Sequence, residues 1–371
     1  MRVGILTYQN ALNVGAVLQA NALQRVITQM GYNCDIIDYR STYLEEIYKY
    51  KKITQVNSLK GLIKWLLNAN KEKRKRIKFD KFNLQYQKLS KTVYFKQNIE
   101  DANKEYNIFI VGSDQVWNMN LNGKDTTYLL DFAQNNKTKI SYAASFGYKK
   151  IPGEYLDITH NGISRIDAIS VRETSGSSIV GKMVGKEPQV VLDPTLLLKK
   201  DEWDLTSIKR LHEKEYILVY IIAATPTILE FSKKLGKEHN CDVICIHNSY
   251  APKSGVKNVR DCSPIEFLSY IKHAKFVVSS SFHGICFSIL FEKEFFFELD
   301  EKPENNNSRI ETLIENLGLW KRQIVGGNCV MDDKIDYERV TDKLNSEREK
   351  SYEFLKESME DSKYIKESGN D

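Results

Sequence analysis

Residues 275–293 are Lys-Phe-Val-Val-Ser-Ser-Ser-Phe-His-Gly-Ile-Cys-Phe-Ser-Ile-Leu-Phe-Glu-Lys. The β-branched run 276–278 predicts a buried parallel strand, and the apolar run that follows Gly284 predicts a helix. His283 should therefore lie between the carboxyl end of a strand and the amino terminus of a helix. Open α/β sheets bind ligands at that edge, and a helix start leaves backbone N–H groups free for an anion. The stretch predicts a phosphate or carboxylate site beside a proton donor, although a histidine that merely fills a turn would give the same pattern.

Strands and helices alternate in the same way on both sides of this stretch. In the first half, strands are predicted at residues 3–7, 34–38, 107–111, 139–144, 168–171 and 189–192. In the second half, strands are also predicted at residues 216–222, 242–247 and 294–299. Repeated alternation of this kind is typical of α/β proteins, in which helices cover parallel sheets.

A break between two halves is indicated near residue 200. Asp193-Pro194 closes the first series of strands, and residues 199–214 are charged and polar. We therefore predict an N-terminal domain of residues 1–200, a C-terminal domain of residues 201–334 and a C-terminal helix in residues 335–371. Two domains joined at one hinge predict a cleft between them, and the final helix could pack back across the first domain.

The composition of the 371-residue chain is that of an ordinary soluble protein, with 42% hydrophobic and 28% charged residues. The formal net charge of +5 is mild and no RNA- or DNA-binding motif accompanies it, so we expect no nucleic-acid partner. No signal-peptide pattern and no apolar run of membrane-spanning length occur, which favours a cytoplasmic protein. The six cysteines are scattered and the histidines do not pair at metal-ligand spacing, so we expect reduced thiols and no metal site.

Polar motifs follow two strands of the first half. Asn13 and Gly15 suit a tight turn into a helix, and a plain turn without a ligand is the alternative. Asp114 and Trp117 follow the strand at 107–111, and a carboxylate beside an indole is a common way to hold a sugar. The alternative is a helix cap by Asp114 with a tryptophan in the core.

Two arginines are candidates for binding an anion. Arg172 follows the strand at 168–171, and its planar guanidinium suits a carboxylate or a phosphate. An ion pair with Glu173 or another acid is the alternative. Arg309 begins a predicted helix and could point towards the same cleft as His283. A solvated helix start is the alternative there, because an arginine opposes the helix dipole unless an anion compensates it.

The segment 58–81 interleaves apolar residues with basic ones, including the run Lys71-Glu72-Lys73-Arg74-Lys75-Arg76. A basic amphipathic helix can lie on an anionic membrane surface. The alternative is a lysine-coated helix that packs on its own domain. Peripheral contact with the inner face of the plasma membrane through residues 58–81 is therefore an open expectation.

The ordered set of motifs resembles the polysaccharide pyruvyl transferase family over roughly residues 1–330. The motifs are Asn13-Val14-Gly15-Ala16, residues 112–118, 141–147, 170–173, 192–195 and 279–284, and Arg309 ahead of residues 317–319. The resemblance implies two Rossmann-like domains in a glycosyltransferase-B-like arrangement, with the acceptor on the N-terminal side and the donor on the C-terminal side. It also implies transfer of a pyruvyl group from phosphoenolpyruvate (PEP) to two hydroxyls of a sugar in a cell-surface polysaccharide or its precursor. The product would be a cyclic ketal, with PEP as co-substrate and no other cofactor.

One departure from the family pattern affects the donor side. Better-known members have Ser-x-Arg-Leu-His, with both Arg and His contacting PEP, whereas this chain has Ser279-Ser280-Ser281-Phe282-His283. Ser281 stands where the arginine is expected. Either Arg309 or Arg172 supplies the missing charge, or the donor differs.

These observations assign provisional roles to the candidate residues. A histidine that titrates near neutral pH suits the proton transfers of ketal formation, so His283 is expected to act as a general acid or to bind phosphate. The expected donor-binding residues are Arg172, Arg309, Ser279, Ser281 and Gly284, and the expected acceptor-binding residues are Asn13, Gly15, Asp114 and Trp117. We expect the imidazole to open into the cleft beside the cations that hold the donor.

Two other functions stay open. A sugar-nucleotide-dependent glycosyltransferase of the same fold would explain the cleft and the acceptor motif. A non-catalytic binding protein with a degenerate site would explain Ser281. The acceptor could be a sugar or a lipid-linked oligosaccharide, and the residues do not name it.

Overall fold

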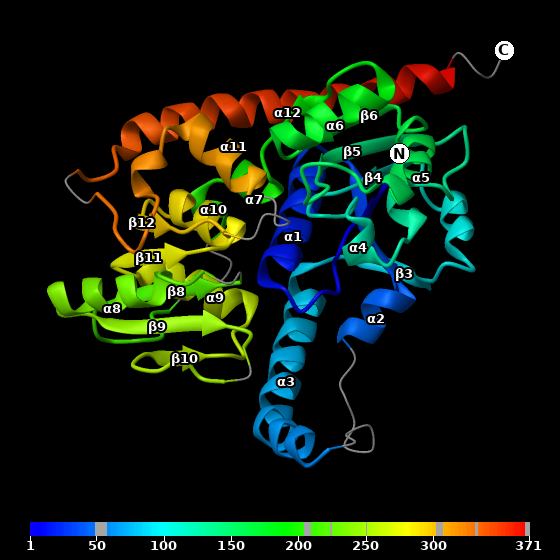
Figure 1. Cartoon of the computed structure of the whole chain (residues 1–371). Helices are drawn as coiled ribbons and strands as arrows, with labels where there is room; N and C mark the ends of the chain where they lie inside the picture. The colour runs from blue at the N-terminus through cyan, green and yellow to red at the C-terminus, as the bar shows by residue number, and fades with distance from the viewer. Residues whose placement is uncertain are drawn as a thin grey trace.

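A computed structural model describes residues 1–48, 58–203, 209–222, 225–249, 251–301, 307–330 and 333–367, with the backbone alone for 59–68 and 361–367. It contains two sheets, one in each half of the chain, with helices packed around them (Figure 1). All pairings between the named strands are parallel in this part of the chain. The predicted α/β class with two Rossmann-like domains is confirmed.

The larger sheet has the strand order β3-β2-β1-β4-β5-β6-β7, which is typical of doubly wound nucleotide-binding folds. Its third strand, β1, places Val3 opposite both Cys34 and Ile108. These strands are rich in β-branched residues because both faces of the sheet are covered. The strands are β1 (Arg2–Leu6), β2 (Asn33–Tyr39), β3 (Leu89–Tyr94), β4 (Ile108–Val111), β5 (Thr138–Ala144), β6 (Ala168–Val171) and β7 (Gln189–Val190).

The smaller sheet repeats this winding with the order β10-β9-β8-β11-β12. Its strands are β8 (Tyr216–Ile221), β9 (Asp242–His247), β10 (Lys257–Val259), β11 (Phe276–Ser279) and β12 (Glu294–Phe297). The first sheet ends at Val190 and the second begins at Tyr216, on either side of the predicted boundary near residue 200. The halves share one apolar cluster that includes Val17, Leu196 and Phe287.

Helices connect the strands and begin at recognisable caps. Ser263 and Glu266 form a capping box, with Pro264 at the first helical position. The helices of the N-terminal half are α1 (Val14–Gln29), α2 (Thr42–Tyr48), α3 (Leu59–Tyr86), α4 (Met119–Asn122), α5 (Leu156–Ile163), α6 (Thr174–Val184) and α7 (Pro194–Leu197). Those that follow are α8 (Ile228–Glu238), α9 (Pro264–His273), α10 (Phe282–Leu290), α11 (Ser308–Leu317) and α12 (Tyr337–Glu367).

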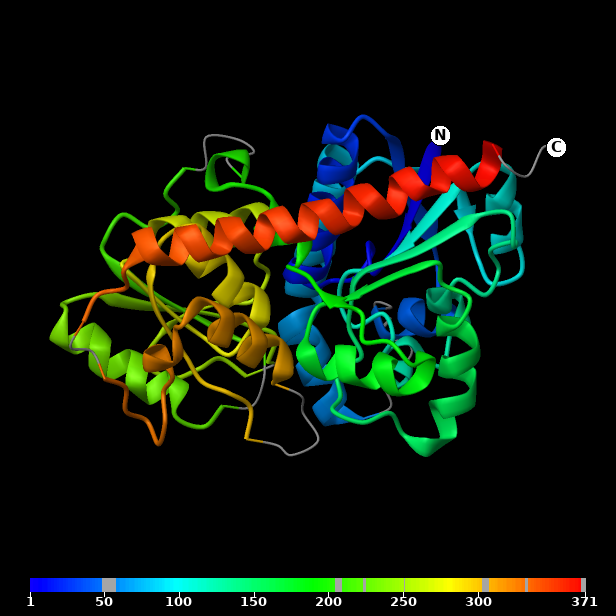
Figure 2. The same ribbon diagram turned by 90° about the horizontal axis from the view of Figure 1, so that it is seen from above.

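The last helix, α12, crosses from the C-terminal half to the N-terminal half, as predicted (Figure 2). Its Ser351 accepts a hydrogen bond from the backbone N–H of Leu192 at 3.0 Å. Its Arg348 donates to the carbonyl of Leu196 at 2.6 Å. The helix therefore braces the segment that joins the two sheets.

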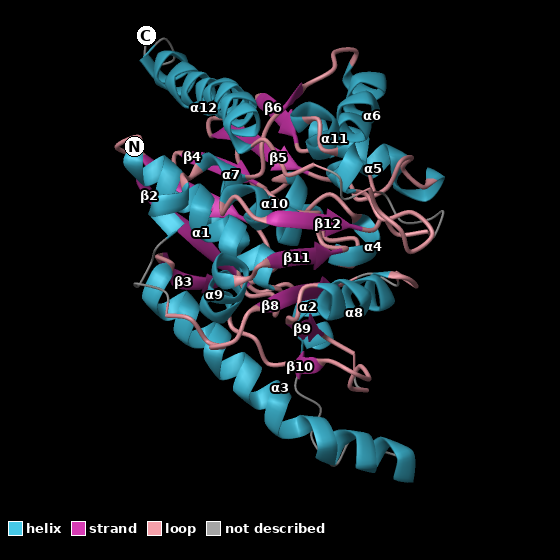
Figure 3. Cartoon of the chain, turned by 90° about the vertical axis from the view of Figure 1, so that its left-hand side faces the viewer, coloured by secondary structure: helices cyan, strands magenta, loops and turns pink. Residues whose placement is uncertain are grey.

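The basic segment lies within α3, which runs beside α9 (Figure 3). Arg74 pairs with Asp261 at 2.7 Å and Lys78 with Glu266 at 2.8 Å, so both cations contact the other half. These contacts agree with a lysine-rich helix that packs on its own protein. No helix in the described ranges combines the length and the apolar character needed to cross a bilayer.

Candidate active site

Side chains from the carboxyl ends of both sheets meet at the boundary between the halves. The strand order reverses between β1 and β4 in the larger sheet and between β8 and β11 in the smaller one. Such switch points are where open α/β sheets bind ligands. Asp114 follows β4 and His283 follows β11, so both predicted residues lie at a switch point.

His283 is the second residue of α10 and lies between the two halves. Its Nε2 is 3.4 Å from Oδ2 of Asp193, an ion-pair distance without the alignment of a hydrogen bond. Only 8% of the side chain is exposed. The expectation that the imidazole opens into the cleft is therefore wrong in this arrangement, because the start of α1 covers the ring.

The residue that covers the ring is Gly15. A Cβ at this position would lie 2.0 Å from Nδ1 and 2.5 Å from Cγ of His283, so no other residue fits without movement. Asn13 is the N-cap of α1, and its side-chain oxygen accepts hydrogen bonds from the N–H groups of Gly15 at 2.9 Å and Ala16 at 3.4 Å. Two of the predicted acceptor residues therefore shape the start of α1: Asn13 caps the helix, and Gly15 allows it to pack against His283.

Substituting Gly15 with alanine should therefore displace the imidazole. For the catalytic role of His283 that is proposed below, we expect the Gly15→Ala variant to lose about 10²-fold in kcat, since a shift of about 1 Å in a catalytic group can cost that much. Overpacking should also lower its free energy of unfolding by about 1–3 kcal/mol. Gly153→Ala is the matched control, because a Cβ at Gly153 would meet nothing within 4 Å. Equal initial rates for the two variants would show that Gly15 does not position His283.

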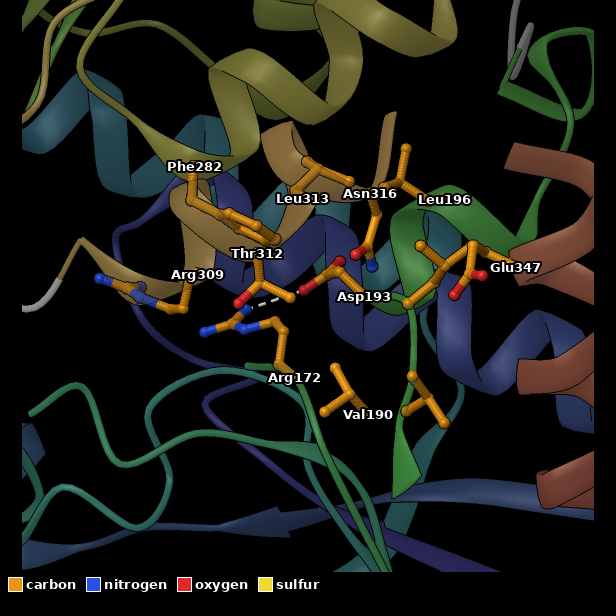
Figure 4. A pocket seen from close by; sticks show the side chains of 12 residues that line it. Arg172, Val190, Asp193, Leu196, Phe282, Arg309, Thr312, Leu313, Asn316 and Glu347 are labelled. Carbon is orange, nitrogen blue, oxygen red and sulfur yellow. Dashed lines mark hydrogen bonds and ion pairs between the residues drawn. The ribbon is translucent and has the colours of Figure 1, made fainter. Parts of the chain in front are cut away.

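Arg172 is buried at the end of β6 and holds two carboxylates. Its Nη1 donates to Oδ2 of Asp193 at 2.8 Å, and its Nη2 donates to Oδ1 of Asp114 at 3.4 Å. The ring of Phe282 covers the guanidinium, with 4.8 Å between the ring centroid and Cζ (Figure 4). The ion-pair alternative for Arg172 therefore holds with Asp193 and Asp114 as its partners.

Asp193 contacts both Arg172 and His283, and it was not among the site residues predicted from the sequence. Burial alone would raise the pKa of Asp193, but His283 and Arg172 hold that pKa well below its ordinary value. Burial would also lower the pKa of Arg172, but Asp193 and Asp114 hold it above its ordinary value. Arg172 and Asp193 therefore remain charged at neutral pH.

Arg309, the second residue of α11, faces the same cavity as Arg172, Asp193 and Phe282 (Figure 4). Among the described residues no carboxylate lies within ion-pair distance of its guanidinium, and its Nε has no hydrogen-bond partner. Burial, and then repulsion by Arg172, lower its pKa. Glu173, Asp114 and Asp193 oppose this shift from beyond ion-pair distance, so a buried cation beside a second one is still suited to an anionic ligand.

The other predicted donor residues shape the turn before α10. The Ser281 hydroxyl caps the helix by accepting from the N–H of Gly284 at 3.4 Å. The Ser279 hydroxyl donates to the carbonyl of Tyr220 at 3.1 Å. A Cβ at Gly284 would lie 2.3 Å from that hydroxyl, so the glycine permits the close packing. These three residues position His283, and none of them lines the cavity beside Arg309.

Trp117 lies apart from the site, in the core of the N-terminal half. It is fully buried, and its Nε1 donates to the carbonyl of Tyr128 at 3.1 Å. Its ring packs against Phe146 with 5.1 Å between centroids. The core alternative therefore fits Trp117, and with no exposed surface it offers no contact to a sugar in this arrangement.

Glu173 is a buried carboxyl that the sequence analysis treated only as a partner for Arg172. Its Oε1 accepts from the Ser145 hydroxyl at 2.8 Å, and its Oε2 has no hydrogen-bond partner. Burial raises its pKa, although Arg172 and Arg309 oppose the shift. A buried carboxyl with a raised pKa is a candidate proton carrier. In the sequence, only its position next to Arg172 pointed to a role in the site.

A recess at the ends of β1 and β2 was also missed; we call it the tyrosine recess. Four tyrosines line it together with Asn10 and Glu45, namely Tyr8, Tyr39, Tyr48 and Tyr128. The Tyr8 hydroxyl donates to the carbonyl of Gln115 at 3.0 Å, which joins the recess to the loop that carries Asp114. Aromatic faces combined with polar groups are suited to a sugar.

The family model described as polysaccharide pyruvyl transferase matches residues 13–297. The chain belongs to the polysaccharide pyruvyl transferase family. The match includes Gly15, Asp114, Arg172, Asp193 and His283, whereas Arg309 lies beyond its end. Among curated proteins no match was found.

Solved structures resemble this pyruvyl transferase family member only distantly. A putative UDP-N-acetylglucosamine 2-epimerase from Listeria monocytogenes has a TM-score of 0.48 and 10% identity, covering 95% of this chain and 90% of the other. The S. aureus MnaA–UDP structure has a TM-score of 0.47 and 11% identity, covering 96% and 91%. The E. coli ADP-heptose lipopolysaccharide heptosyltransferase II has a TM-score of 0.35 and 12% identity, covering 94% and 99%. Similarity at this level carries no functional argument.

Proposed function

We propose that this polysaccharide pyruvyl transferase family member uses PEP as its donor and forms a cyclic ketal on two hydroxyls of a saccharide. The observation that carries the proposal is Arg309, which has no ion-pair partner among the described residues and lies beside Arg172 in a cavity bounded by the starts of α10 and α11. PEP bears a phosphate and a carboxylate, and Arg309 next to the starts of α10 and α11 offers a cation to one of them, whereas Arg172 is already paired with Asp193 and Asp114. Arg309 would then compensate for Ser281, which caps α10 and brings no charge.

The reaction needs one proton at the donor and removes two from the acceptor. The methylene carbon of PEP takes a proton and becomes a methyl group, and the first hydroxyl adds to the neighbouring carbon. The bond from that carbon to the phosphate oxygen then breaks, and the second hydroxyl closes the ketal. One hydroxyl proton balances the new methyl group, and the other leaves with inorganic phosphate.

In this proposal His283 delivers the proton to the methylene carbon. The buried carboxylate of Asp193, 3.4 Å from Nε2, would stabilise the protonated imidazole. Because Gly15 covers the ring, we infer that the starts of α1 and α10 separate when the donor enters. Donor binding by Arg309 would therefore be coupled to access at His283.

The acceptor would bind on the N-terminal side. Asp114 pairs with Arg172, and its neighbour Gln115 accepts a hydrogen bond from Tyr8 of the tyrosine recess, so in the proposal Asp114 lies between donor and acceptor. Three of the four tyrosines of the recess are buried, so in the proposal the sugar packs on the half-buried Tyr48, and Asp114 accepts a hydroxyl proton. Trp117 has no place in this site, because it is fully buried.

The decisive experiment incubates the protein with carbon-labelled PEP and a panel of free and lipid-linked saccharides. We expect acceptor-dependent release of phosphate together with label in the product. Arg309→Ala should raise the KM for PEP about 10- to 100-fold, as expected for the loss of one charge-assisted hydrogen bond. Arg165→Ala is the matched control, because Arg165 contacts only backbone carbonyls in the N-terminal half.

Two outcomes would point to the other functions. A larger rise in melting temperature with a sugar nucleotide than with PEP would favour a glycosyltransferase. Binding of neither donor, with PEP binding gained in Ser281→Arg, would favour a non-catalytic protein with a degenerate site. Either result would overturn the proposed donor.

A further inference from the structure

A second cation-lined cavity lies on the other side of the α1 start from His283. Three basic residues line it, each from a different segment: Lys75 from α3, His247 from the end of β9 and Arg260 just after β10. Asn13 and Asn248 complete its polar lining. Among the described residues that line the cavity there is no carboxylate. We call it the α3 cation cavity.

Two other cations of α3 close to Lys75 form ion pairs with the C-terminal half, whereas Lys75 has none among the described residues. Arg74 pairs with Asp261 at 2.7 Å, and Lys78 pairs with Glu266 at 2.8 Å. Lys75 lies between them and has no carboxylate at ion-pair distance among the described residues; its Nζ donates to Oδ1 of Asn248 at 2.9 Å and lies 5.5 Å from the ring centroid of Phe79. Burial lowers its pKa, so the protein bears a cost for keeping this ammonium group in place.

His247 contributes a neutral ring to the lining, because its lowered pKa keeps it uncharged at neutral pH and both ring nitrogens have partners, Asn258 and Ser249. It is 3% exposed, and its Nε2 lies 2.7 Å from Oδ1 of Asn258. Burial lowers its pKa, and the cations Arg260, Lys253 and Lys71 lower it further. Lys75 and Arg260 are therefore the cations of the lining, and a cavity lined by cations and amides, with no carboxylate among its described lining residues, suits an anion.

The position of the cavity connects it with the candidate active site. Asn13 lines the α3 cation cavity, and Gly15, two residues along the chain, packs against the His283 ring. Two residues span at most about 8 Å of backbone. One extended substrate could therefore occupy both places, with its anionic group beside Lys75 and its reacting hydroxyls near His283.

We propose that the α3 cation cavity binds a phosphate or diphosphate group that the acceptor saccharide carries. The inference rests on the proposed function for the identity of the acceptor, and on the cavity alone for the chemistry of the bound group. A diphosphate that joins a saccharide to a lipid and the diphosphate of a nucleotide share this chemistry. The cavity lies against α3, whose basic character extends beyond it.

Binding of inorganic pyrophosphate, measured by calorimetry on the intact protein, tests the site directly. Lys75→Ala and Arg260→Gln should each weaken pyrophosphate binding about 10-fold or more, the effect of one lost charge-assisted hydrogen bond. Lys75→Arg should retain most of the affinity. Lys73→Ala is the matched control, because it removes the same charge from an exposed position on the same helix. Unchanged melting temperatures would show that the variants are folded.

Further ligands distinguish the source of the diphosphate and separate this site from the donor site. Tighter binding of farnesyl diphosphate than of uridine diphosphate would support a lipid-linked acceptor, and the reverse order would support a nucleotide. Pyrophosphate binding that is lost in Arg309→Ala but kept in Lys75→Ala would overturn the inference. If PEP is turned over while Lys75 has no effect on pyrophosphate, the inference fails and the proposed function stands. If pyrophosphate binds through Lys75 but PEP is not used, the proposed function fails and the anion site stands.

Discussion

Replacing His283 with alanine is expected to lower kcat for the proposed PEP-dependent ketal formation by about 10²- to 10⁴-fold, which is what a positioned proton donor, the role proposed for His283, contributes. The side chain lies 3.4 Å from the buried carboxylate of Asp193 and is held by Gly15. Alanine would leave the capping bond between Ser281 and Gly284 in place, so α10 should remain formed. Initial rates of phosphate release with saturating acceptor measure the effect.

The same measurement has controls that separate chemistry from folding. His160→Ala, on the exposed surface of α5, should keep the wild-type rate. His283→Asn retains a polar side chain but cannot donate a proton from a cationic ring, so it should be as slow as the alanine variant. The KM for PEP should change less than kcat, since Arg309 carries much of the donor charge in the proposed site. Turnover by His283→Ala within about threefold of wild type would remove the proton role.

The local structure around His283 could be predicted because it depends on neighbours in the sequence. The β-branched run 276–278 and the apolar run after Gly284 predict a strand and a helix, and β11 ends at Ser279 while α10 begins at Phe282. The serine that caps the helix lies within the same stretch. Strand–helix alternation likewise predicts two parallel sheets, because each crossover is a local pattern.

The contacts that complete the site come from distant parts of the chain and could not be predicted. Asp193 follows the last strand of the first sheet, and nothing in its neighbourhood indicates that it pairs with Arg172 and His283. Gly15 was interpreted as a turn residue, whereas its close packing is against an imidazole 268 positions along the chain, the difference between residues 283 and 15. The bounds of a strand or helix depend on neighbouring residues in the sequence, whereas contacts between the two halves depend on the whole fold.

Trp117 shows that residue types alone do not distinguish a sugar-binding tryptophan from a tryptophan in the core. An indole beside a carboxylate predicts a sugar site, but the same amphipathic ring is equally suited to a core with one carbonyl acceptor. The structure has the second arrangement, with Nε1 bonded to Tyr128. The tyrosine recess lies nearby, but its members come from three segments, at Tyr8, Tyr39 to Tyr48 and Tyr128, so no single motif contains it.

Asp193→Asn is expected to lower the free energy of unfolding by about 3–5 kcal/mol, the usual cost of removing one partner from a buried ion pair. The guanidinium of Arg172 has a side-chain exposure of 1% and would keep only the more distant carboxylate of Asp114, at 3.4 Å. Urea-induced unfolding at pH 7, followed by both tryptophan fluorescence and circular dichroism, measures the loss, provided that the two transitions coincide. Asp157→Asn, at an exposed position of α5, is the control and should change stability by less than about 0.5 kcal/mol.

The pH dependence of this difference identifies the carboxylate as its cause. The pKa of Asp193 is held well below its ordinary value in the folded protein, despite the opposing effect of burial. A carboxyl whose pKa is lower in the folded state stabilises the fold fully above the unfolded-state pKa of about 3.9, and this stabilisation is lost as the pH falls through the folded-state pKa. The gap between wild type and Asp193→Asn should therefore stay constant from pH 7 to about pH 5 and narrow below about pH 4. A gap that persists unchanged to pH 3 would mean that the loss comes from altered packing, because protonating the wild-type carboxyl would then have no effect.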